Sequence, residues 1–160
     1  MESTELHKYL VINNISKESN IKALFITAYA HEFSLLIITN NFKDMEYYST
    51  LGVSSTQFTS LFECKNYLQS VGVILVGIEI MEDAKSILSF PFSSSIAFMP
   101  GNEGTGLSNK QKEFCDQFVY IPQYGSGTAS LNVNVATAIV LHQYQQWSLK
   151  EADIESSISK

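Results

Sequence analysis

Short apolar runs alternate with amphipathic segments along this chain of 160 residues. The apolar runs have the length and the β-branched content that are typical of buried strands. They are Tyr9–Ile12, Leu35–Ile38, Val73–Ile78, Ser95–Met99 and Phe118–Ile121. The segments whose spacing predicts helices are Ile21–Glu32, Thr59–Val71, Glu82–Leu88, Ser108–Cys115 and Ser130–Trp147. This alternation predicts an α/β domain, with a mostly parallel sheet and helices on both of its faces.

The same pattern indicates how the chain is divided. It has no internal repeat and no linker rich in proline or glycine, so we expect residues 1–150 to form one domain. Asp44–Gly52, which is rich in aromatic residues, predicts a short helix or a loop, and the polar residues 151–160 predict a fraying tail. We expect Ser19 and Asn20 to cap the first helix and Ser130 to open the last.

Composition and charge favour a compact globule and limit the ways in which it can bind a polyanion. Hydrophobic residues make up 45% of the chain and charged residues 16%, against a usual charged share of about 25%. The net charge is -6, so bulk electrostatics do not favour nucleic acid. All ten basic residues are lysine, and the chain contains no arginine.

The cysteines and histidines do not have metal-ligand spacing. Cys64 and Cys115 are isolated, which predicts free thiols in a reducing compartment, and the three histidines are scattered. We therefore expect no metal. No apolar run reaches the roughly 18–20 residues that span a bilayer, and the N-terminus is polar. These features predict a cytoplasmic protein without a membrane segment.

Two glycine-rich loops in the C-terminal half follow predicted strands. They are Gly101–Ser108 and the start of Ile121–Ala136, which leads through Ser130-Leu-Asn132 into the last helix. Glycine lets the backbone approach a ligand closely, and the start of a helix offers free N–H groups and a positive dipole end. In open α/β sheets ligands bind beyond the carboxyl ends of the strands. The loops after Val76, Met99 and Ile121 therefore predict one shared pocket.

The spacing of these glycines excludes several common sites. Gly101-Asn-Glu-Gly-Thr-Gly106 does not fit G-x-G-x-x-G and lacks the Gly-Lys-Ser/Thr of a P-loop. Gly125-Ser-Gly127 and Ser130 do not fit the G-x-S-x-G elbow of serine hydrolases. A further alternative is a nucleotide-binding flavodoxin-like module, but the order of the motifs argues against it.

Both loops match motifs of a known family. Gly101-Asn-Glu-Gly-Thr-Gly-Leu107 and Ile121-Pro-Gln-Tyr-Gly125, followed by Ser130-Leu-Asn-Val-Asn-Val-Ala136, resemble motifs 2 and 3 of the SpoU-type RNA ribose 2′-O-methyltransferases. This family lies within the SPOUT, or α/β-knot, superfamily, and the resemblance covers essentially the whole chain. It implies a C-terminal trefoil knot, a homodimer, S-adenosylmethionine as the methyl donor, and a tRNA or rRNA substrate.

The resemblance also implies which residues form the site. By position, those expected to contact S-adenosylmethionine are Val76, Gly77, Met99, Gly101, Ile121, Ser130 and Leu131. Those expected to act on the reacting ribose or to organise the knot around it are Asn20, Glu103, Ser130 and Asn132.

Motif 1 of the family, roughly N-x-G-x-x-x-R-T/S-A, is matched only in part by Asn20–Ala28. Lys22 stands in the position of the glycine and Ile26 in that of the arginine. Two hypotheses follow: an active RNA methyltransferase, or a catalytically impaired relative that serves as a donor-binding or regulatory dimeric subunit. Lys22 either reaches toward the vacated position or is a solvated surface residue. Lys110 and Lys112, beside motif 2, are candidates for phosphate contact or a solvated helix face.

Overall fold

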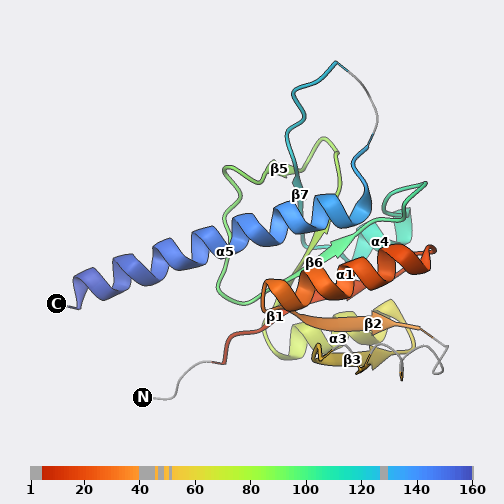
Figure 1. The fold of residues 1–160 in the computed structure, drawn as a ribbon, viewed down its shortest axis with the longest axis horizontal. Helices are drawn as coiled ribbons and strands as arrows, with labels where there is room; N and C mark the ends of the chain where they lie inside the picture. Colours follow the sequence, from red (N-terminus) through yellow and green to blue (C-terminus); the bar gives the residue numbers. More distant parts are fainter. Residues whose placement is uncertain (1–4, 40–45, 47–48, 51, 127–129, 160) are drawn as a thin grey trace.

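The computed structural model describes residues 5–39, 46, 49–50, 52–126 and 130–159 (Figure 1). These residues form a seven-stranded sheet in the order β3-β2-β1-β6-β4-β7-β5, and all of its neighbouring strands run parallel. The strands are β1 (Lys8–Ile12), β2 (Ser34–Ile38), β3 (Ser55–Phe58), β4 (Ile74–Ile78), β5 (Lys85–Ser86), β6 (Ile96–Pro100) and β7 (Gln117–Tyr120). The helices are α1 (Glu18–Ala30), α3 (Leu61–Ser70), α4 (Asn109–Phe114) and α5 (Val133–Ile158). The predicted parallel α/β architecture is confirmed.

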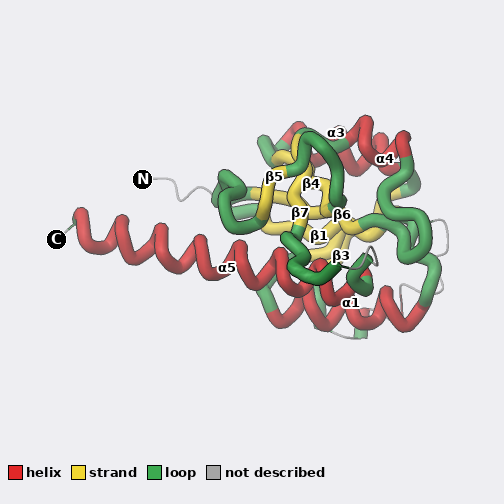
Figure 2. Tube along the Cα trace, turned by 90° about the horizontal axis from the view of Figure 1, so that it is seen from above, coloured by secondary structure: helices red, strands yellow, loops and turns green. Residues whose placement is uncertain are grey.

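Helices cover both faces of the sheet, with α1 and α5 on one face and α3 and α4 on the other (Figure 2). Because successive side chains of a strand point to opposite faces, β1 contributes to two cores. Leu10 and Ile12 pack with α1 and α5, whereas Tyr9 and Val11 pack on the side of α3. Burial on both faces explains why the central strands are continuous apolar runs in the sequence.

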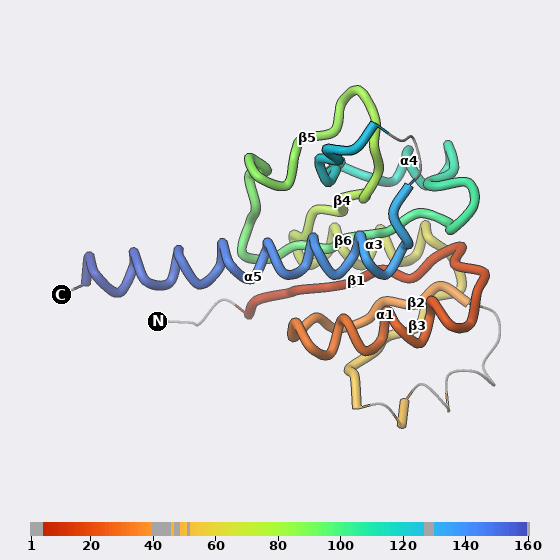
Figure 3. Tube along the Cα trace, turned by 45° about the horizontal axis from the view of Figure 1, so that its top comes forward, coloured from red at the N-terminus to blue at the C-terminus, as the bar shows by residue number. Residues whose placement is uncertain are grey.

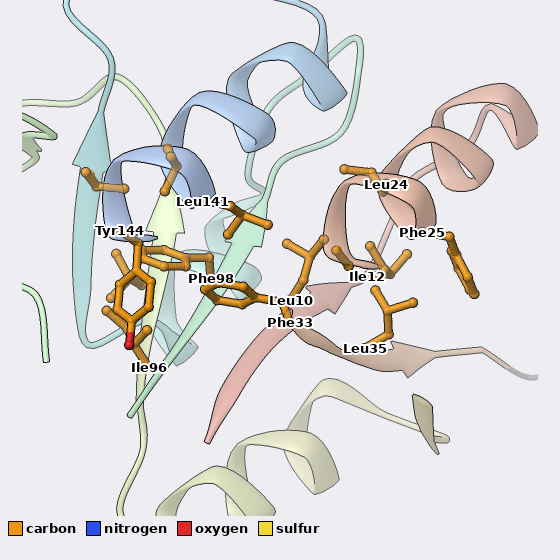
Figure 4. Close-up of a cluster of buried hydrophobic side chains, with 14 of the residues drawn as sticks. Leu10, Ile12, Leu24, Phe25, Phe33, Leu35, Ile96, Phe98, Leu141 and Tyr144 are labelled. Atoms are coloured by element: carbon orange, nitrogen blue, oxygen red, sulfur yellow. The ribbon is translucent and has the colours of Figure 1, made fainter. Parts of the chain in front are cut away.

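The core under α1 and α5 is rich in aromatic side chains. Figure 4 shows Leu141 and Tyr144 of α5 close to Phe98 of β6, with Leu10 of β1 nearby. The Tyr144 ring lies 5.4 Å from that of Phe33 at 78°, an edge-to-face contact, and its hydroxyl donates a 2.7 Å hydrogen bond to the Ser94 carbonyl. This packing holds the first half of α5 against the sheet.

The second half of α5 extends beyond the sheet (Figures 1 and 3). The helix begins at Val133, with Asn132 as its cap in place of the expected Ser130. It continues past Trp147, the predicted end, to Ile158, and its residues from Leu149 onward are exposed. The expected fraying over 151–160 is therefore not seen in the described residues, which remain helical to Ile158 without packing against the domain.

Two further sequence predictions differ from the structure, and one strand was not predicted. Glu82–Leu88 is not a helix: it contains β5, which extends the sheet by pairing with β7. A segment of seven residues is too short for hydrophobic periodicity to distinguish a helix from a β-strand. β3 was not predicted, because this edge strand is half exposed and has no apolar run. Helix α1 begins at Glu18, so Ser19 and Asn20 lie inside it. Most of Asp44–Gly52 lies outside the described residues.

No helix within the described ranges combines the length and the apolar character that crossing a bilayer requires.

Candidate functional site

A cavity of about 280 Å³ opens at the carboxyl ends of β4, β6 and β7. We call it the donor-side cavity, and four segments line it. They are Ile78–Ile80 after β4, Pro100–Gly106 after β6, Tyr120, Ile121 and Gln123 at the end of β7, and Ser130, Leu131, Val133 and Ala136 at the start of α5. The three predicted loops do converge, because parallel strands present their carboxyl ends at one edge of the sheet.

The loop after β6 is a tight hairpin whose shape depends on glycine. Asn102 and Gly106 exchange backbone hydrogen bonds of 3.0 and 2.9 Å. A Cβ on Gly101 would lie 2.6 Å from the Gly106 carbonyl carbon, and Gly106 itself has a φ of +69°. An L side chain is therefore excluded at Gly101 by contact and disfavoured at Gly106 by conformation. These two glycines thus allow the hairpin to fold tightly at the cavity wall.

Glu79 fastens this hairpin to the end of β4. One carboxylate oxygen accepts a 2.9 Å hydrogen bond from the Leu107 N–H, and the other accepts a 3.1 Å bond from the Ile80 N–H. A Cβ on Gly106 would overlap the Glu79 carboxylate. Sequence reasoning missed Glu79, although it is the first polar residue after a predicted buried strand, which is a signal for a site residue in this fold.

Glu103, at the tip of the hairpin, holds the start of α1. Its carboxylate accepts hydrogen bonds from the Ser16 N–H at 3.0 Å, the Lys17 N–H at 2.7 Å and the Asn20 side-chain amide at 3.1 Å. A carboxylate is also favoured at the positive end of a helix dipole. Glu103 thus fixes the segment that leads into α1, whose N-cap residue Lys17 makes no side-chain cap hydrogen bond.

These bonds determine the protonation of Glu103. Burial by itself would raise the pKa of the carboxyl, but the hydrogen bonds from Ser16, Asn20 and Lys17 stabilise the charged form and lower the pKa to about 2. Glu103 is therefore ionised at neutral pH. A general base works best when its pKa is near the operating pH, so the state of Glu103 suits holding the loop in place rather than accepting a proton.

Asn132 continues the same network to α5. Its amide donates a 3.2 Å hydrogen bond to the Asn20 side-chain oxygen, and its own oxygen accepts from the N–H groups of Asn134 at 2.8 Å and Val135 at 3.2 Å. Asn20 is buried. The structure thus joins three of the predicted residues, Glu103, Asn20 and Asn132, in one chain of hydrogen bonds that links the hairpin, α1 and α5.

The predicted donor-contact residues fall into two groups. Gly101, Ile121, Ser130 and Leu131 line the cavity, as Glu103 does. Val76, Gly77 and Met99 are not among its lining residues; they lie buried inside β4 and β6, one or two positions before residues that do line it. A Cβ on Gly77 would lie 2.7 Å from a Leu107 methyl carbon, so this glycine serves the packing beneath the hairpin.

The partial match to motif 1 lies on α1. Ile26, in the arginine position, is 64% exposed, and Lys22 forms a 3.4 Å ion pair with Glu18 one turn earlier. Thr27, which agrees with the motif, donates a 2.7 Å hydrogen bond to the Asn134 side chain and so ties α1 to α5. The intact part of motif 1 therefore has a structural role here.

Cys64 and Cys115 are free thiols, and burial raises the pKa of each to about 12. Among the described residues, no group of three or more histidine, cysteine, aspartate or glutamate side chains is placed to hold a metal ion.

Comparison with known proteins points to one family. The model of the SpoU rRNA Methylase family matches residues 7–142. The 23S rRNA (guanosine-2'-O-)-methyltransferase RlmB of Coxiella burnetii is 39% identical over 88 residues, which cover 55% of this chain and 34% of that protein. The RlmB of Shewanella oneidensis is 38% identical over 87 residues, covering 54% and 35%. The matched regions thus span about a third of these curated relatives.

Solved structures share the fold at low sequence identity. The SpoU methyltransferase AviRb from Streptomyces viridochromogenes, in complex with the cofactor AdoMet, superimposes with a TM-score of 0.77 at 21% identity, covering 93% of this chain and 63% of that chain. The A. aeolicus TrmH/SpoU tRNA modifying enzyme gives a TM-score of 0.74 at 21% identity, covering 94% and 78%. At such identities the likeness establishes the fold.

Proposed function

Because the chain belongs to the SpoU rRNA Methylase family, we propose that it is an S-adenosylmethionine-dependent RNA ribose 2′-O-methyltransferase that acts on rRNA or tRNA. The curated relatives named above are 23S rRNA 2′-O-methyltransferases, and AviRb binds AdoMet. The observation that carries the proposal is the donor-side cavity, bordered by the hydrogen-bonded chain of Glu103, Asn20 and Asn132.

The cavity suits the methyl donor in its chemistry. Ile78, Ile80, Ile121 and Leu131 form an apolar wall for an adenine ring, and the hairpin, which closes tightly because Gly101 has no Cβ, forms another part of the wall. The donor supplies a methyl group on a sulfonium centre. Ser130, an exposed residue of the cavity wall just before α5, has the hydroxyl that we assign to binding the reacting ribose.

The remaining predicted residues act by positioning. Glu103 stays ionised and holds the start of α1 and the hairpin together, and Asn132 fixes the start of α5 relative to Asn20. Together they keep the walls of the cavity in place before the substrates bind. Preorganisation of this kind lowers the barrier because the reacting groups need not be ordered during the reaction. With the donor bound, the 2′-hydroxyl oxygen of the RNA would take the methyl group as the carbon–sulfur bond breaks. The sulfur would keep that electron pair as a neutral thioether, and the hydroxyl proton would pass to water.

A second candidate function is a donor-binding subunit with little or no transferase activity. The observation that favours it is Ile26, an exposed isoleucine at the arginine position of motif 1, in a chain without any arginine. An identical subunit cannot supply the missing guanidinium, and lysine lacks its planar pair of donors. Loss of a positioned catalytic group typically lowers a rate by about 10²–10⁴-fold.

Transfer of a tritiated methyl group from S-adenosylmethionine to total RNA separates the two functions. We expect incorporation that disappears in Ser130→Ala, while calorimetric binding of S-adenosylmethionine remains within a few-fold of wild type. Donor binding without methyl incorporation would favour the second candidate. If the chain neither binds the donor nor transfers methyl groups, both candidate functions are refuted. Lys22→Ala tests whether that lysine replaces the arginine: an unchanged rate would reject this role.

We further propose a cytoplasmic homodimer with a C-terminal trefoil knot, as the family resemblance implies. Support for the dimer comes from α1 and α5, which lie side by side and both carry exposed large apolar side chains: Ile26 and Tyr29 on α1, Val135 and Ile139 on α5. Apolar surface of this kind is typical of protein interfaces. Light scattering after gel filtration should give twice the chain mass, and Tyr29→Glu should shift it toward the monomer.

A further inference from the structure

A second cavity, of about 300 Å³, lies at the same edge of the sheet but on the face that α3 and α4 cover. We call it the α3–α4 cavity. It is lined by Asn13 and Asn14 after β1, by Ser60, Leu61 and Phe62 at the start of α3, and by Ser108, Lys110, Gln111 and Phe114 of the α4 segment. None of these residues belongs to the donor-side cavity.

The lining combines an aromatic surface with a cation. Phe62 is 60% exposed although it is a large apolar side chain, and Phe114 is half-buried on the opposite helix. Lys110 is exposed and forms no ion pair with any residue that the structure describes. An exposed aromatic ring and an exposed ammonium that line the same cavity match the two parts of a nucleotide, a base that stacks and a phosphate that carries negative charge.

The polar groups between them are set by the fold. Gln111 donates hydrogen bonds to the Asn13 carbonyl at 3.2 Å and to the Asn13 side-chain oxygen at 2.9 Å, and it completes the capping box with Ser108. Gln111 is itself 3% exposed. The wall between β1 and α4 is therefore rigid, which suits a site that orders a flexible ligand.

The two cavities share a wall. Asn102, which lines the donor-side cavity, donates a 2.7 Å hydrogen bond to the carbonyl of Asn14, which lines the α3–α4 cavity. Asn14 adopts a φ of 62°, the left-handed conformation that asparagine tolerates better than most residues. The two cavities therefore adjoin at this pair of residues.

We propose that the α3–α4 cavity holds one nucleotide of single-stranded RNA next to the nucleotide that is methylated, with its base stacked on Phe62 and its phosphate on Lys110. The proposal rests on the proposed function and adds a substrate-binding site to it. The net charge of -6 makes general electrostatic attraction to RNA unfavourable, so stacking has to contribute a large part of the affinity. Stacking is tolerant of sequence because every base has a π face.

Fluorescence anisotropy with 5′-fluorescein-labelled decauridylate and decaadenylate tests the site in the full chain. Loss of one stacked base should weaken binding of Phe62→Ala by about fivefold to a hundredfold, and Phe62→Trp should restore it. Lys110→Ala should reduce the slope of log K against log salt by about 0.7, the value for one phosphate on a single strand. Matched controls are Leu88→Ala and Lys150→Ala, which replace an exposed apolar residue and an exposed lysine outside both cavities.

The outcomes separate this proposal from the proposed function. Weaker RNA binding in Phe62→Ala with unchanged calorimetric affinity for S-adenosylmethionine would support the α3–α4 cavity as an RNA site. RNA binding equal to wild type in both Phe62→Ala and Lys110→Ala would overturn it, while methyl transfer and donor binding would still stand. A wild-type chain that binds neither oligonucleotide would also overturn it; a protein partner would then be the remaining occupant, and donor calorimetry would report separately on the enzyme.

Discussion

Replacing Glu103 with glutamine should destabilise the protein in a way that depends on pH. The glutamate carboxylate accepts from three donors: the Ser16 and Lys17 N–H groups at 3.0 and 2.7 Å and the Asn20 amide at 3.1 Å. Glutamine has one acceptor oxygen and one NH₂ group of similar shape. If its oxygen serves Lys17 and Asn20, its NH₂ faces the Ser16 N–H, and that hydrogen bond is lost together with the negative charge.

The size of the effect follows from these contacts. A hydrogen bond to a charged group contributes about 1.5–3 kcal/mol, and the exposure of this site weakens it. The carboxyl pKa, lowered from 4.5 to about 2 by these bonds against the opposing effect of burial, sets an upper limit of about 3 kcal/mol before solvent screening. After allowance for screening, we expect Glu103→Gln to lower the free energy of unfolding by about 1–2 kcal/mol at pH 7.

The sign of the pH dependence is fixed by the direction of the shift. Because the folded-state pKa lies below the ordinary value, the contribution of Glu103 is fully present above pH 4.5 and is lost as the pH falls toward about 2. Linkage predicts that about half or less of it remains at pH 3. The difference in stability between wild type and Glu103→Gln should therefore shrink over that range.

Urea denaturation monitored by circular dichroism, at pH 7 and pH 3, measures this difference. Glu113→Gln is the matched control, because Glu113 is an exposed glutamate on α4 and should show little change at either pH. A difference for Glu103→Gln that is as large at pH 3 as at pH 7 would refute the assignment to the ionised carboxylate. No difference at pH 7 would refute the hydrogen-bonded network itself.

Three further changes test the surrounding structure. Asn132→Ala removes the cap of α5 and should lower thermal stability by about 1–2 kcal/mol, whereas Asn132→Asp should retain most of it; equal melting points for all three chains would contradict the cap. Gly101→Ala places a Cβ 2.6 Å from the Gly106 backbone and should lower calorimetric affinity for S-adenosylmethionine at least about tenfold; unchanged affinity would show that the hairpin does not shape the cavity. Lys65→Met leaves Asp116 without its 2.5 Å partner and should lower the urea-derived stability by about 2–3 kcal/mol, with partial recovery on adding Asp116→Asn; no loss would mean that the pair is not stabilising.

The central strands were predictable because burial on both faces leaves no polar position in them. The predicted strands Leu35–Ile38 and Val73–Ile78 each differ from β2 and β4 by one residue at the N-terminal end. β3 escaped prediction because an edge strand has one partner and a half-exposed face, so its residues need not be apolar. β5 was misread as a helix because two residues of pairing with β7 leave no periodic signal.

The part of the site that one loop forms was predictable from the sequence. The parts that form where distant segments meet were not. The glycine requirement at Gly101 follows from local backbone geometry, so the loop was visible in the sequence. Glu79 and Leu107 lie 28 positions apart and meet only after the sheet has formed. The bond from Asn132 to Asn20 spans 112 positions. Sequence reasoning assigned these asparagines to the site through family resemblance, without knowing that they touch.

The amino-acid sequence by itself determined the parallel α/β architecture, the glycine loops and the family, because hydrophobic periodicity and local backbone demands are properties of neighbouring residues. The tertiary structure alone decided that Glu103 is an ionised group that fixes the entry to α1, and that Asn102 and Asn14 separate two cavities along one edge of the sheet. Protonation states and shared walls depend on groups that are far apart in the chain, and only the order of the strands brings them within hydrogen-bonding distance.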